Sequence, residues 1–473
     1  MDRLTAWMSA CCDALWTYVL IALLVVCGLW FTWRTRGVQF RLAGHMLRLL
    51  GESAIQREGL PASQKRRRQS VSSFQAFAVS IATRVGTGNL AGVAIAIATG
   101  GPGAVFWMWV IALLGASTAF VESTLAQLFK QRGKDSFVGG PAYYILHGLR
   151  CRWMSVLFAI LITLTFGLSY NSVQANTICQ ALDQAFGWQP WVVGVVLSLL
   201  SLLIVFGGIH RVSRVSSVLV PLMAVGYLLL ALVVVGIHWR MVPHVFRLIV
   251  ESAFGIQQVA GGSVGMALII GMRRGLFSNE AGEGSAPNVA ATAAVSHPVK
   301  QGLIQALGVF TDTLLVCSCT AFIILLSGVH TTGEADGIRL TQVALSATIG
   351  PAGEVFVAVA IFLFAFSSII GNYYYGETNI RFLSPSPVLM LVYRLFSGGV
   401  MVMIGALMSL ELVWGFGDLC MALITACNLA AVIPLSRYVF ALLRHYQQQR
   451  REGKNPVFHR EDLPEVAERL SYW

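Results

Sequence analysis

The chain has 473 residues, of which 56% are hydrophobic and only 12% are charged, and its mean hydropathy is +0.70. A soluble domain carries about 25% charged residues, so the composition excludes a soluble globular protein and predicts a polytopic membrane protein. The net charge of +11 would suit a nucleic-acid partner, but its distribution along the chain argues against one. No stretch is long or polar enough to form a separate soluble domain.

Apolar stretches long enough to cross a bilayer, at roughly 20 residues each, recur along the whole chain. We predict eleven spans, of which the seventh is broken. Their ranges are Ala14–Phe31, Phe74–Ala98, Val105–Phe129, Ser155–Leu182, Trp191–Phe206, Val215–Ile237, Gly261–Ala291, Gly302–Leu326, Val355–Phe382, Val388–Leu410 and Leu412–Phe440. The first lacks the strongly basic start and the small-residue cleavage site of a signal peptide, so we interpret it as a spanning helix.

Lysine and arginine gather in the loops on one predicted side of the membrane. The first loop, residues 34–68, holds nine of them, and the tail, residues 437–469, holds seven more. The other side has Arg3, Arg240, Arg247 and Arg339. Because positive charge concentrates in cytoplasmic loops, we expect the N-terminus outside and the C-terminus in the cytoplasm, in a bacterial inner (plasma) membrane. The basic runs then suit anionic membrane lipids and require no nucleic acid.

The second span is interrupted at its centre by residues 84–89, Arg-Val-Gly-Thr-Gly-Asn. Two glycines around a threonine, with a charge and an amide beside them, are poor material for a helix. Free backbone groups at membrane depth are tolerated only where they face buried protein, a water-filled cavity or a ligand. The interruption therefore predicts a binding site inside the membrane, and so a transporter.

The seventh span is interrupted between Gly275 and Asn288 by three glycines, a proline, two carboxylates and two amides. Its apolar flanks, residues 265–272 and 289–295, are each too short to cross alone. They predict two half-helices, with a polar loop between two short helices as the alternative. With the first span set aside, the broken helices are the first and sixth of ten. This spacing is typical of two five-helix repeats of opposite orientation.

We therefore expect one transmembrane transporter domain over residues 1–473. It comprises an extra N-terminal helix over 14–33, one five-helix repeat over 70–237, a second repeat over 255–443 and a cytoplasmic tail over 444–473. The N-terminus of a half-helix suits a carboxylate, whereas its C-terminus and loose carbonyls suit a cation. A zwitterionic amino acid bound beside a sodium ion matches both.

Two motifs resemble the alanine-or-glycine:cation (sodium:alanine) symporter family. They are GGPGAVFWMW at residues 100–109, followed by Gly115, and FSNEAG at residues 277–282, followed by Gly284 and Ser285. The resemblance implies the leucine-transporter (LeuT) fold, which is all-α, with a five-plus-five inverted repeat and here one extra N-terminal helix. It also implies import of alanine or glycine, with D-alanine as a further candidate, coupled to Na⁺. It implies no enzymatic activity and no organic cofactor.

The same resemblance implies that Thr87 and Gly88 bind the substrate carboxylate. Gln174 of the third core helix is a candidate on a different ground, as an amide inside a span that would bond the substrate or else join helices. The substrate candidates are Gly86, Thr87, Gly88, Asn89, Gln174, Phe277, Ser278 and Asn279. The implied Na⁺ ligands are the carbonyls of Ala82, Val85 and Phe364 and the hydroxyls of Ser367 and Ser368. Five oxygens of this kind suit a hard cation.

Charges at membrane depth need partners. We expect Arg84 to pair with Glu280 or Asp312, and Glu283 to join a structural or gating ion pair. A carboxylate among these leaves a proton-coupled amino-acid transporter as the alternative to a sodium symporter. The sequence alone does not determine the preferred amino acid, the number of ions or the oligomeric state, which could be a monomer.

Two other classes of protein fit the sequence less well. The letters GGSVG at residues 261–265 match the hydrolase motif G-x-S-x-G, but that motif needs a strand-to-helix turn in an α/β sheet. A channel usually shows pore-lining rings from identical subunits, which two unlike broken helices do not suggest.

Overall fold

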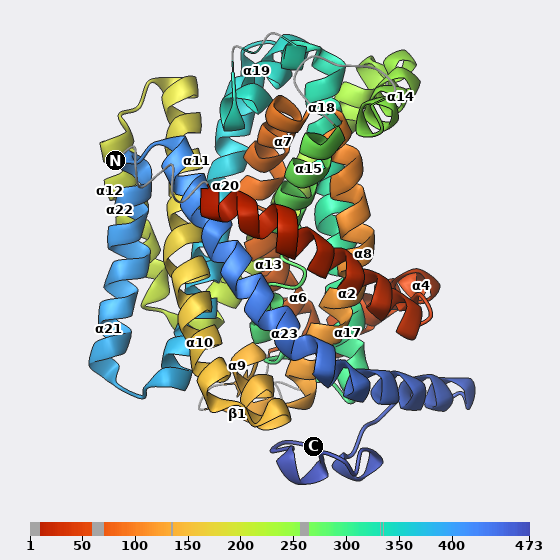
Figure 1. Ribbon diagram of the computed structural model, residues 1–473. Helices are drawn as coiled ribbons and strands as arrows, with labels where there is room; N and C mark the ends of the chain where they lie inside the picture. The colour runs from red at the N-terminus through yellow and green to blue at the C-terminus, as the bar shows by residue number, and fades with distance from the viewer. Residues whose placement is uncertain (1–9, 59–70, 134–135, 256–263, 332, 334) are drawn as a thin grey trace.

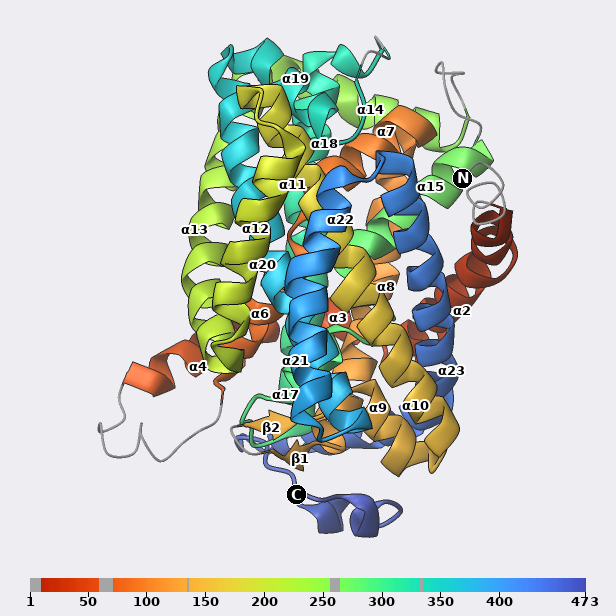
Figure 2. The same ribbon diagram turned by 90° about the vertical axis from the view of Figure 1, so that its left-hand side faces the viewer.

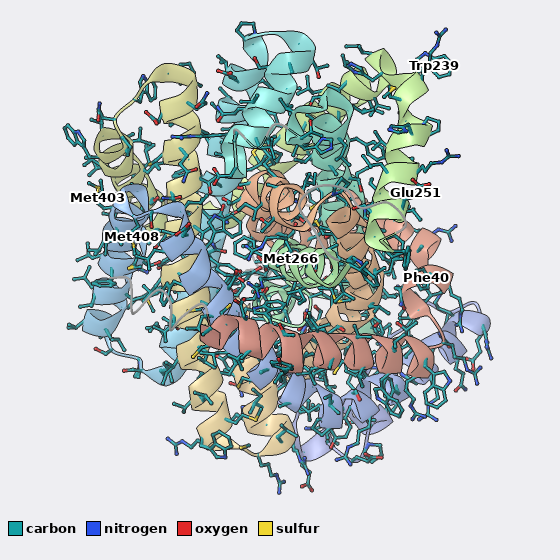
Figure 3. The ribbon with its side chains drawn as sticks, turned by 45° about the horizontal axis from the view of Figure 1, so that its top comes forward. Phe40, Trp239, Glu251, Met266, Met403 and Met408 are labelled. Carbon is teal, nitrogen blue, oxygen red and sulfur yellow. The ribbon has the colours of Figure 1, made fainter. Side chains whose placement is uncertain are left out.

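The computed structural model describes residues 10–58, 71–133, 136–255, 264–331, 333 and 335–473. The letters GGSVG fall largely outside this range. The described residues form an elongated helical bundle with the C-terminal residues folded beneath one end (Figures 1 and 2). We call this end the tail end, and the opposite end, where α14 and α19 lie, the far end. Figure 3 views the bundle with the far end brought forward, so that Met266 of α15 lies near the centre.

The N-terminal segment is one helical run over Ala10–Arg34, which includes η1 (Trp16–Leu20) and α2 (Ile21–Arg34). It packs closely on α8 (Gly103–Leu128), because a Cβ on Gly28 would lie only 2.7 Å from Leu114 Cβ. Two further helices follow, α3 (Val38–Arg41) and α4 (Ala43–Glu58). The predicted extra N-terminal helix is therefore present, whereas α4, too short and polar to resemble a span, was not predicted.

The first core helix is broken where the sequence predicts it. Its first half, α6 (Ser73–Arg84), begins with a reciprocal cap in which Ser72 Oγ accepts from Gln75 N–H at 3.1 Å and Gln75 Oε1 accepts from Ser72 N–H at 3.2 Å. It ends at Arg84 because Val85 is extended, with ψ of 95°. The helix resumes as a π-helical turn, η2 (Gly88–Gly92), and continues as α7 (Val93–Gly100), bent by 48° from α6.

The sixth core helix is also broken, but the break is shorter than predicted. Its first half, α15 (Val264–Asn279), continues through Gly275, and its second half is α16 (Ala286–Ala290). The prediction of a half-helix over residues 289–295 was wrong. α16 starts earlier, with Pro287 in its first turn, where a missing N–H is tolerated. It ends at Ala290, and the following strand-like link pairs Ala294 N–H with Val71 O at 3.2 Å.

The remaining elements connect and surround these two helices. The tail-end hairpin pairs β1 (Gln131–Arg132) with β2 (Phe137–Val138), antiparallel, with Gln131 opposite Val138. The first half of the chain adds α9 (Pro141–Tyr144), η3 (Ile145–Leu149), α10 (Arg152–Ile162), η4 (Thr163–Tyr170), α11 (Asn171–Phe186), α12 (Pro190–Val205), α13 (Gly208–Ile237), η5 (Trp239–Met241) and α14 (Val242–Ala253). The second half adds α17 (Pro298–Val309), η6 (Phe310–Cys317), α18 (Ser318–Ser327), η7 (Val329–Thr331), α19 (Gly337–Ile349), α20 (Ala352–Leu383), α21 (Pro387–Leu395), η8 (Phe396–Val400), α22 (Met401–Leu407), α23 (Leu410–Arg451), η9 (Arg460–Asp462) and η10 (Ala467–Arg469).

Packing follows the symmetry of two opposed repeats. The two broken helices contact each other half to half, α6 against α16 and α7 against α15. The second core helix, α8, packs on the seventh, α17, and the third, ending in α11, packs on the eighth, α20. The fourth, α12, packs on α22 of the ninth. Each of these helices thus lies against the helix five positions later, which places the two breaks side by side at the centre.

Seven helices in the described part of the chain are long and apolar enough to cross a membrane, or up to nine if each bent pair counts as one span. α12 is shorter, at 16 residues, and the broken pair α15–α16 follows residues outside the described range. The count of eleven therefore stays a prediction. α14, bent by 80° from the preceding helix, and α19 are far-end helices that the sequence did not predict.

Candidate binding site at the two helix breaks

The first break exposes backbone N–H groups, and side chains bond them. Thr87 donates to Gln174 Oε1 twice, from its backbone N–H at 3.0 Å and from its hydroxyl at 2.5 Å. Gly86 N–H donates to Asn89 Oδ1 at 2.9 Å. All four residues are buried. The structure therefore brings Gln174 of the third core helix directly onto the predicted carboxylate-binding backbone.

The second break comes into contact with the first through Gly88. A Cβ on Gly88 would lie 2.9 Å from Ser278 Cα and 3.1 Å from Phe277 Cδ1, so only glycine permits this approach. Asn279 lies on the other side of α15, where its Oδ1 accepts from Ala281 N–H at 3.0 Å. Of the three candidates on α15, Phe277 and Ser278 face the first break and Asn279 caps its own helix.

Asp312 joins the two breaks from the seventh core helix. Its Oδ1 accepts from Asn89 Nδ2 at 2.7 Å, and its Oδ2 accepts from Ser278 Oγ at 2.7 Å and from Thr313 Oγ1 at 2.9 Å. The sequence analysis expected Arg84 to pair with either Glu280 or Asp312. Among the described residues Arg84 forms no ion pair within 4.0 Å, and its Nη1 instead donates to Gln305 O at 3.2 Å. The carboxylate is held by three neutral donors.

The irregular segment of the second break is held from three neighbouring helices. Glu122 of α8 accepts from Gly282 N–H at 3.3 Å and from Asn428 Nδ2 at 2.9 Å, and the same Asn428 amide donates to Gly282 O at 2.8 Å. Both N–H and C=O of Gly282, whose φ is +103°, are thus bonded. Tyr170 OH donates to Glu283 at 3.2 Å, so this glutamate has a hydroxyl partner in place of the expected ion pair. The opened backbone is pinned by these bonds.

Four of the five predicted cation ligands lie together beside the first break. Ser368 Oγ lies 2.9 Å from Ala82 O and 3.1 Å from Phe364 O, and Ser367 Oγ lies 3.3 Å and 2.8 Å from the same two carbonyls. A Cβ on the adjacent Gly86 would overlap Ser368 Oγ and lie 3.0 Å from Gln174 Oε1. The fifth ligand, Val85, belongs to the extended link between α6 and η2. This group of neutral oxygens fits a hard monovalent cation.

The candidate Phe277 and several aromatic and charged side chains that were not candidates cover the breaks on their far-end side. The ring of Phe277 lies 4.7 Å, centroid to centroid, from those of Tyr170 and Trp414. Above it the guanidinium of Arg274 stands 4.6 Å from the Trp414 ring and pairs with Asp418. The signals in the sequence are the two charges themselves, Arg274 in the seventh predicted span and Asp418 in the last. Their pairing across two helices could not be read from spacing.

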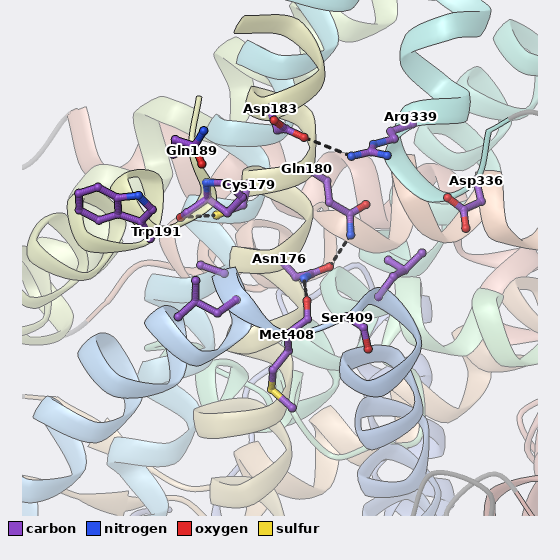
Figure 4. Close-up of a pocket in the computed structure, with 14 residues that line it drawn as sticks. Asn176, Cys179, Gln180, Asp183, Gln189, Trp191, Asp336, Arg339, Met408 and Ser409 are labelled. Carbon is purple, nitrogen blue, oxygen red and sulfur yellow. Dashed lines mark hydrogen bonds and ion pairs between the residues drawn. The ribbon is translucent and has the colours of Figure 1, made fainter. Parts of the chain in front are cut away.

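A cavity of about 510 Å³ lies at the far end between α11, α12, α19 and the start of α23 (Figure 4). Its polar lining includes Asn176 and Gln180, which are hydrogen bonded at 2.7 Å, and the ion pair of Asp183 with Arg339 at 3.2 Å. Asn176 follows Gln174 by two residues, so the two side chains leave different faces of α11. The cavity is therefore separate from the helix breaks.

Two opposed repeats, each with a broken first helix whose breaks meet at mid-bundle, define a secondary transporter of the LeuT fold. A solved Na⁺-coupled sialic acid symporter superposes with a TM-score of 0.52 at 16% identity, over 93% of this chain and 97% of that one. The pattern of the sodium:alanine symporter family matches residues 1–460, and the chain belongs to that family. It is thus a multi-pass, cation-coupled amino-acid symporter and not an enzyme.

Several curated relatives match over nearly their whole length. The amino-acid carrier protein AlsT of Bacillus subtilis is 51% identical over 96% of this chain and 94% of its own. The probable sodium/glutamine symporter GlnT of the same organism is 49% identical over 95% and 92%. The sodium/proton-dependent alanine carrier protein of Bacillus sp. (strain PS3) is 36% identical over 82% and 91%. The substrates and ions in these names differ.

Proposed function

We propose that the protein imports a small neutral amino acid, alanine or glycine, together with Na⁺, with its C-terminus in the cytoplasm. The observation that carries the substrate part is the double hydrogen bond to Gln174. An amide oxygen accepts from both the backbone N–H and the hydroxyl of Thr87, which is what a carboxylate oxygen of the substrate would do there. On binding, the carboxylate takes that place, and the Gln174 amide turns to donate to it.

The enclosure around Phe277 favours a small side chain. The substrate would sit between the first break and the ring of Phe277, which Tyr170 and Trp414 hold in place on both sides. A methyl group or hydrogen fits against these rings, whereas a longer chain would have to displace them. Glutamine, suggested by the name of one relative, is the test case for this reasoning.

The serine pair supports Na⁺ as the coupling ion. Each of the two hydroxyls lies within 3.3 Å of both carbonyls, so α20 and the end of α6 together supply four neutral oxygens beside the segment that would hold the substrate. One charge crossing ~100 mV, with a roughly tenfold gradient, supplies ~3.7 kcal/mol and supports accumulation on the order of 500-fold. A single sodium ion is therefore sufficient to concentrate a neutral zwitterion.

Proton coupling is the second candidate, and Asp312 is the observation that favours it. It is a fully buried carboxylate that accepts from both breaks, so its protonation would change both at once. If protons are the coupling ion, Asp312→Asn should remove the dependence of uptake on an imposed pH gradient. If Na⁺ alone drives uptake, uptake by the wild-type protein is already independent of the imposed pH gradient, and the variant shows no change in this respect.

Uptake into proteoliposomes tests the proposal. Labelled alanine, glycine, glutamine and leucine would be supplied with an imposed Na⁺ gradient, an imposed H⁺ gradient, or neither. We expect Na⁺-driven uptake of alanine or glycine, strong loss in Gln174→Ala, and near-normal uptake in Gln180→Ala, which alters the same helix at the separate cavity. Equal uptake of leucine, or uptake that ignores Na⁺, would overturn the assignment.

A further inference from the structure

The last 22 residues of the chain fold back onto the tail end of the bundle. After α23 ends at Arg451, the chain turns beneath the hairpin and forms η9 and η10 (Figure 2). Its apolar side chains Phe458, Leu463, Val466 and Leu470 are buried. The segment is therefore docked on the transporter core.

The final two residues complete an aromatic cage around Lys130, just past the end of α8. The Lys130 ammonium lies 4.5 Å from the ring centre of Phe137 and 4.6 Å from those of Tyr472 and Trp473. Trp473 Nε1 also donates to Gln127 O at 3.0 Å. A buried ammonium faced by three rings is held by cation–π attraction that is strongest when water is excluded.

The caged lysine is bonded in turn to the segment that follows the second break. Lys130 Nζ donates to Ala293 O at 3.1 Å and to Gln127 Oε1 at 2.8 Å. Gln127 Nε2 donates to Ala293 O at 3.0 Å and to the carbonyl of Ala290, the last residue of α16, at 2.5 Å. Since Ala294 N–H donates to the carbonyl of Val71, two residues before α6, one chain of hydrogen bonds links the cage to the tail-side halves of both broken helices.

A second anchor lies where the same link meets α17. Phe458 N–H donates to Ser296 O at 2.9 Å, and Ser296 Oγ donates to Pro456 O at 2.8 Å. Lys300 Nζ donates to Asn455 Oδ1 at 2.6 Å. The two anchors touch each other, because the rings of Phe458 and Trp473 lie 5.4 Å apart.

Opening the tail end of the site requires one group of core helices to move against another. The cage and the second anchor connect, directly or through the link after the second break, to the tail-side ends of α6, α8, α16 and α17. The docked segment also binds η3, which precedes the third core helix, because Arg469 Nη1 donates to Gly148 O at 3.2 Å. We propose that residues 452–473 are a latch that holds the tail end of the transporter closed, and that release of Tyr472 and Trp473 from Lys130 precedes opening at that end. The latch rests on the position of the breaks and is independent of which amino acid or ion is carried.

The test is the accessibility of a reporter cysteine in the closed half. Ser80 is fully buried on the tail-side half of the first core helix, where its Oγ donates to Gln305 Oε1 of α17 at 2.7 Å, so a reagent can reach it once that end opens. Ser80→Cys would be introduced into the full chain in nanodiscs, where both faces are open to a charged thiol reagent. The labelling rate of the Ser80→Cys protein, minus that of the same protein with Ser80 retained, reports opening of the tail end.

We expect the pair Tyr472→Leu and Trp473→Leu, which keeps apolar bulk but removes the rings, to raise the labelling rate about tenfold. Glu465→Ala, an exposed change in the same segment, is the matched control and should leave the rate unchanged. Lys130→Met removes the ammonium instead of the rings. It should raise the labelling rate to the same extent, and it serves as the test if the tail variants fail to insert into the membrane. Labelling that stays at the parent rate in folded cage variants would overturn the latch, whatever the substrate assay shows.

Discussion

Removing the two serine hydroxyls beside the first break should weaken activation by Na⁺ without unfolding the protein. Ser367 and Ser368 supply two of the five oxygens proposed to bind the ion. The loss of one ligand oxygen at about 1.4 kcal/mol is a tenfold loss of affinity, so the double change to alanine should raise the half-saturating Na⁺ concentration on the order of 100-fold. Ser368→Ala should cost more than Ser367→Ala, because Ser368 Oγ is the hydroxyl that lies against Gly86 of the first break, where an added Cβ would overlap it.

The assay is amino-acid uptake into proteoliposomes as a function of Na⁺ concentration. A second readout is the stabilisation of the purified protein by Na⁺, since an ion that binds the folded state raises its apparent stability by mass action. Ser436→Ala is the matched control, because Ser436 is a buried serine whose Oγ also donates to a carbonyl of its own helix, Ile433 O at 2.7 Å. It should leave both readouts unchanged.

An unchanged half-saturating Na⁺ concentration in the double variant, with uptake retained, would refute the placement of the ion. Loss of uptake together with an unchanged Na⁺-induced stabilisation would refute it as well, because binding would then persist without the hydroxyls.

Three further outcomes are expected. Gly88→Ala should lower uptake at least tenfold in a protein that still inserts, because the added Cβ would lie 2.9 Å from Ser278 Cα, and normal uptake would mean that the breaks do not need this approach. Asn428→Leu should destabilise the fold by about 3 kcal/mol, because it leaves the buried Glu122 carboxylate short of a donor, and an unshifted unfolding midpoint would contradict this. Lowering the pH from 7 to 5 should loosen the docked tail by up to ~2 kcal/mol through His297, which protease cleavage of the tail would detect.

The sign of the pH effect follows from the burial of His297. Burial, with smaller contributions from His445 and Lys300, lowers the pKa of His297 to about 2 from its ordinary 6.5. Because the pKa of His297 is lowered in the docked state, its contribution to the stability of the docked tail is complete above pH 6.5. That contribution is lost progressively as the pH falls below 6.5. Protonation would also end the hydrogen bond that Nδ1 accepts from Val299 N–H at 3.2 Å. Lys130, whose pKa burial lowers to about 7, goes from about half charged to almost fully charged in this window, which changes the docking free energy by less than the ~2 kcal/mol expected from His297. Cleavage that is equal at both pH values would contradict the reasoning.

The position of the first break was predictable from local chemistry, whereas its partners were not. Gly86 and Gly88 mark a segment that cannot continue a helix, and this signal lies entirely within six residues. Gln174 was a candidate because an amide at membrane depth is unusual. The two hydrogen bonds that it accepts from Thr87, however, depend on how the third core helix packs. Asp312 was named as a possible ion-pair partner of Arg84 because the sequence shows which residues carry opposite charges. It does not show which neutral donors on other helices will reach the carboxylate.

The second break shows the same division. Its glycines and carboxylates predicted an interruption, but the helix continues through Gly275 because α8 packs closely there, where a Cβ on Gly275 would lie 3.2 Å from Met108 Cα. Tertiary contact thus overrides the low helix propensity of glycine. The docking of the tail had no sequence signal, since a basic and polar stretch of this kind is usually a solvated end.

At the two ends of the bundle, different chemistry holds different halves of the same broken helix. At the far end, Arg274 of α15 is fixed to Asp418 of α23 beneath the Trp414 ring. At the tail end, α16 is fixed through Gln127 to the cage around Lys130. The joint between these halves is held in place by Glu122 and Asn428. A pinned joint lets one half swing while the other stays closed, so the substrate can be released toward one end without opening a continuous path through the membrane.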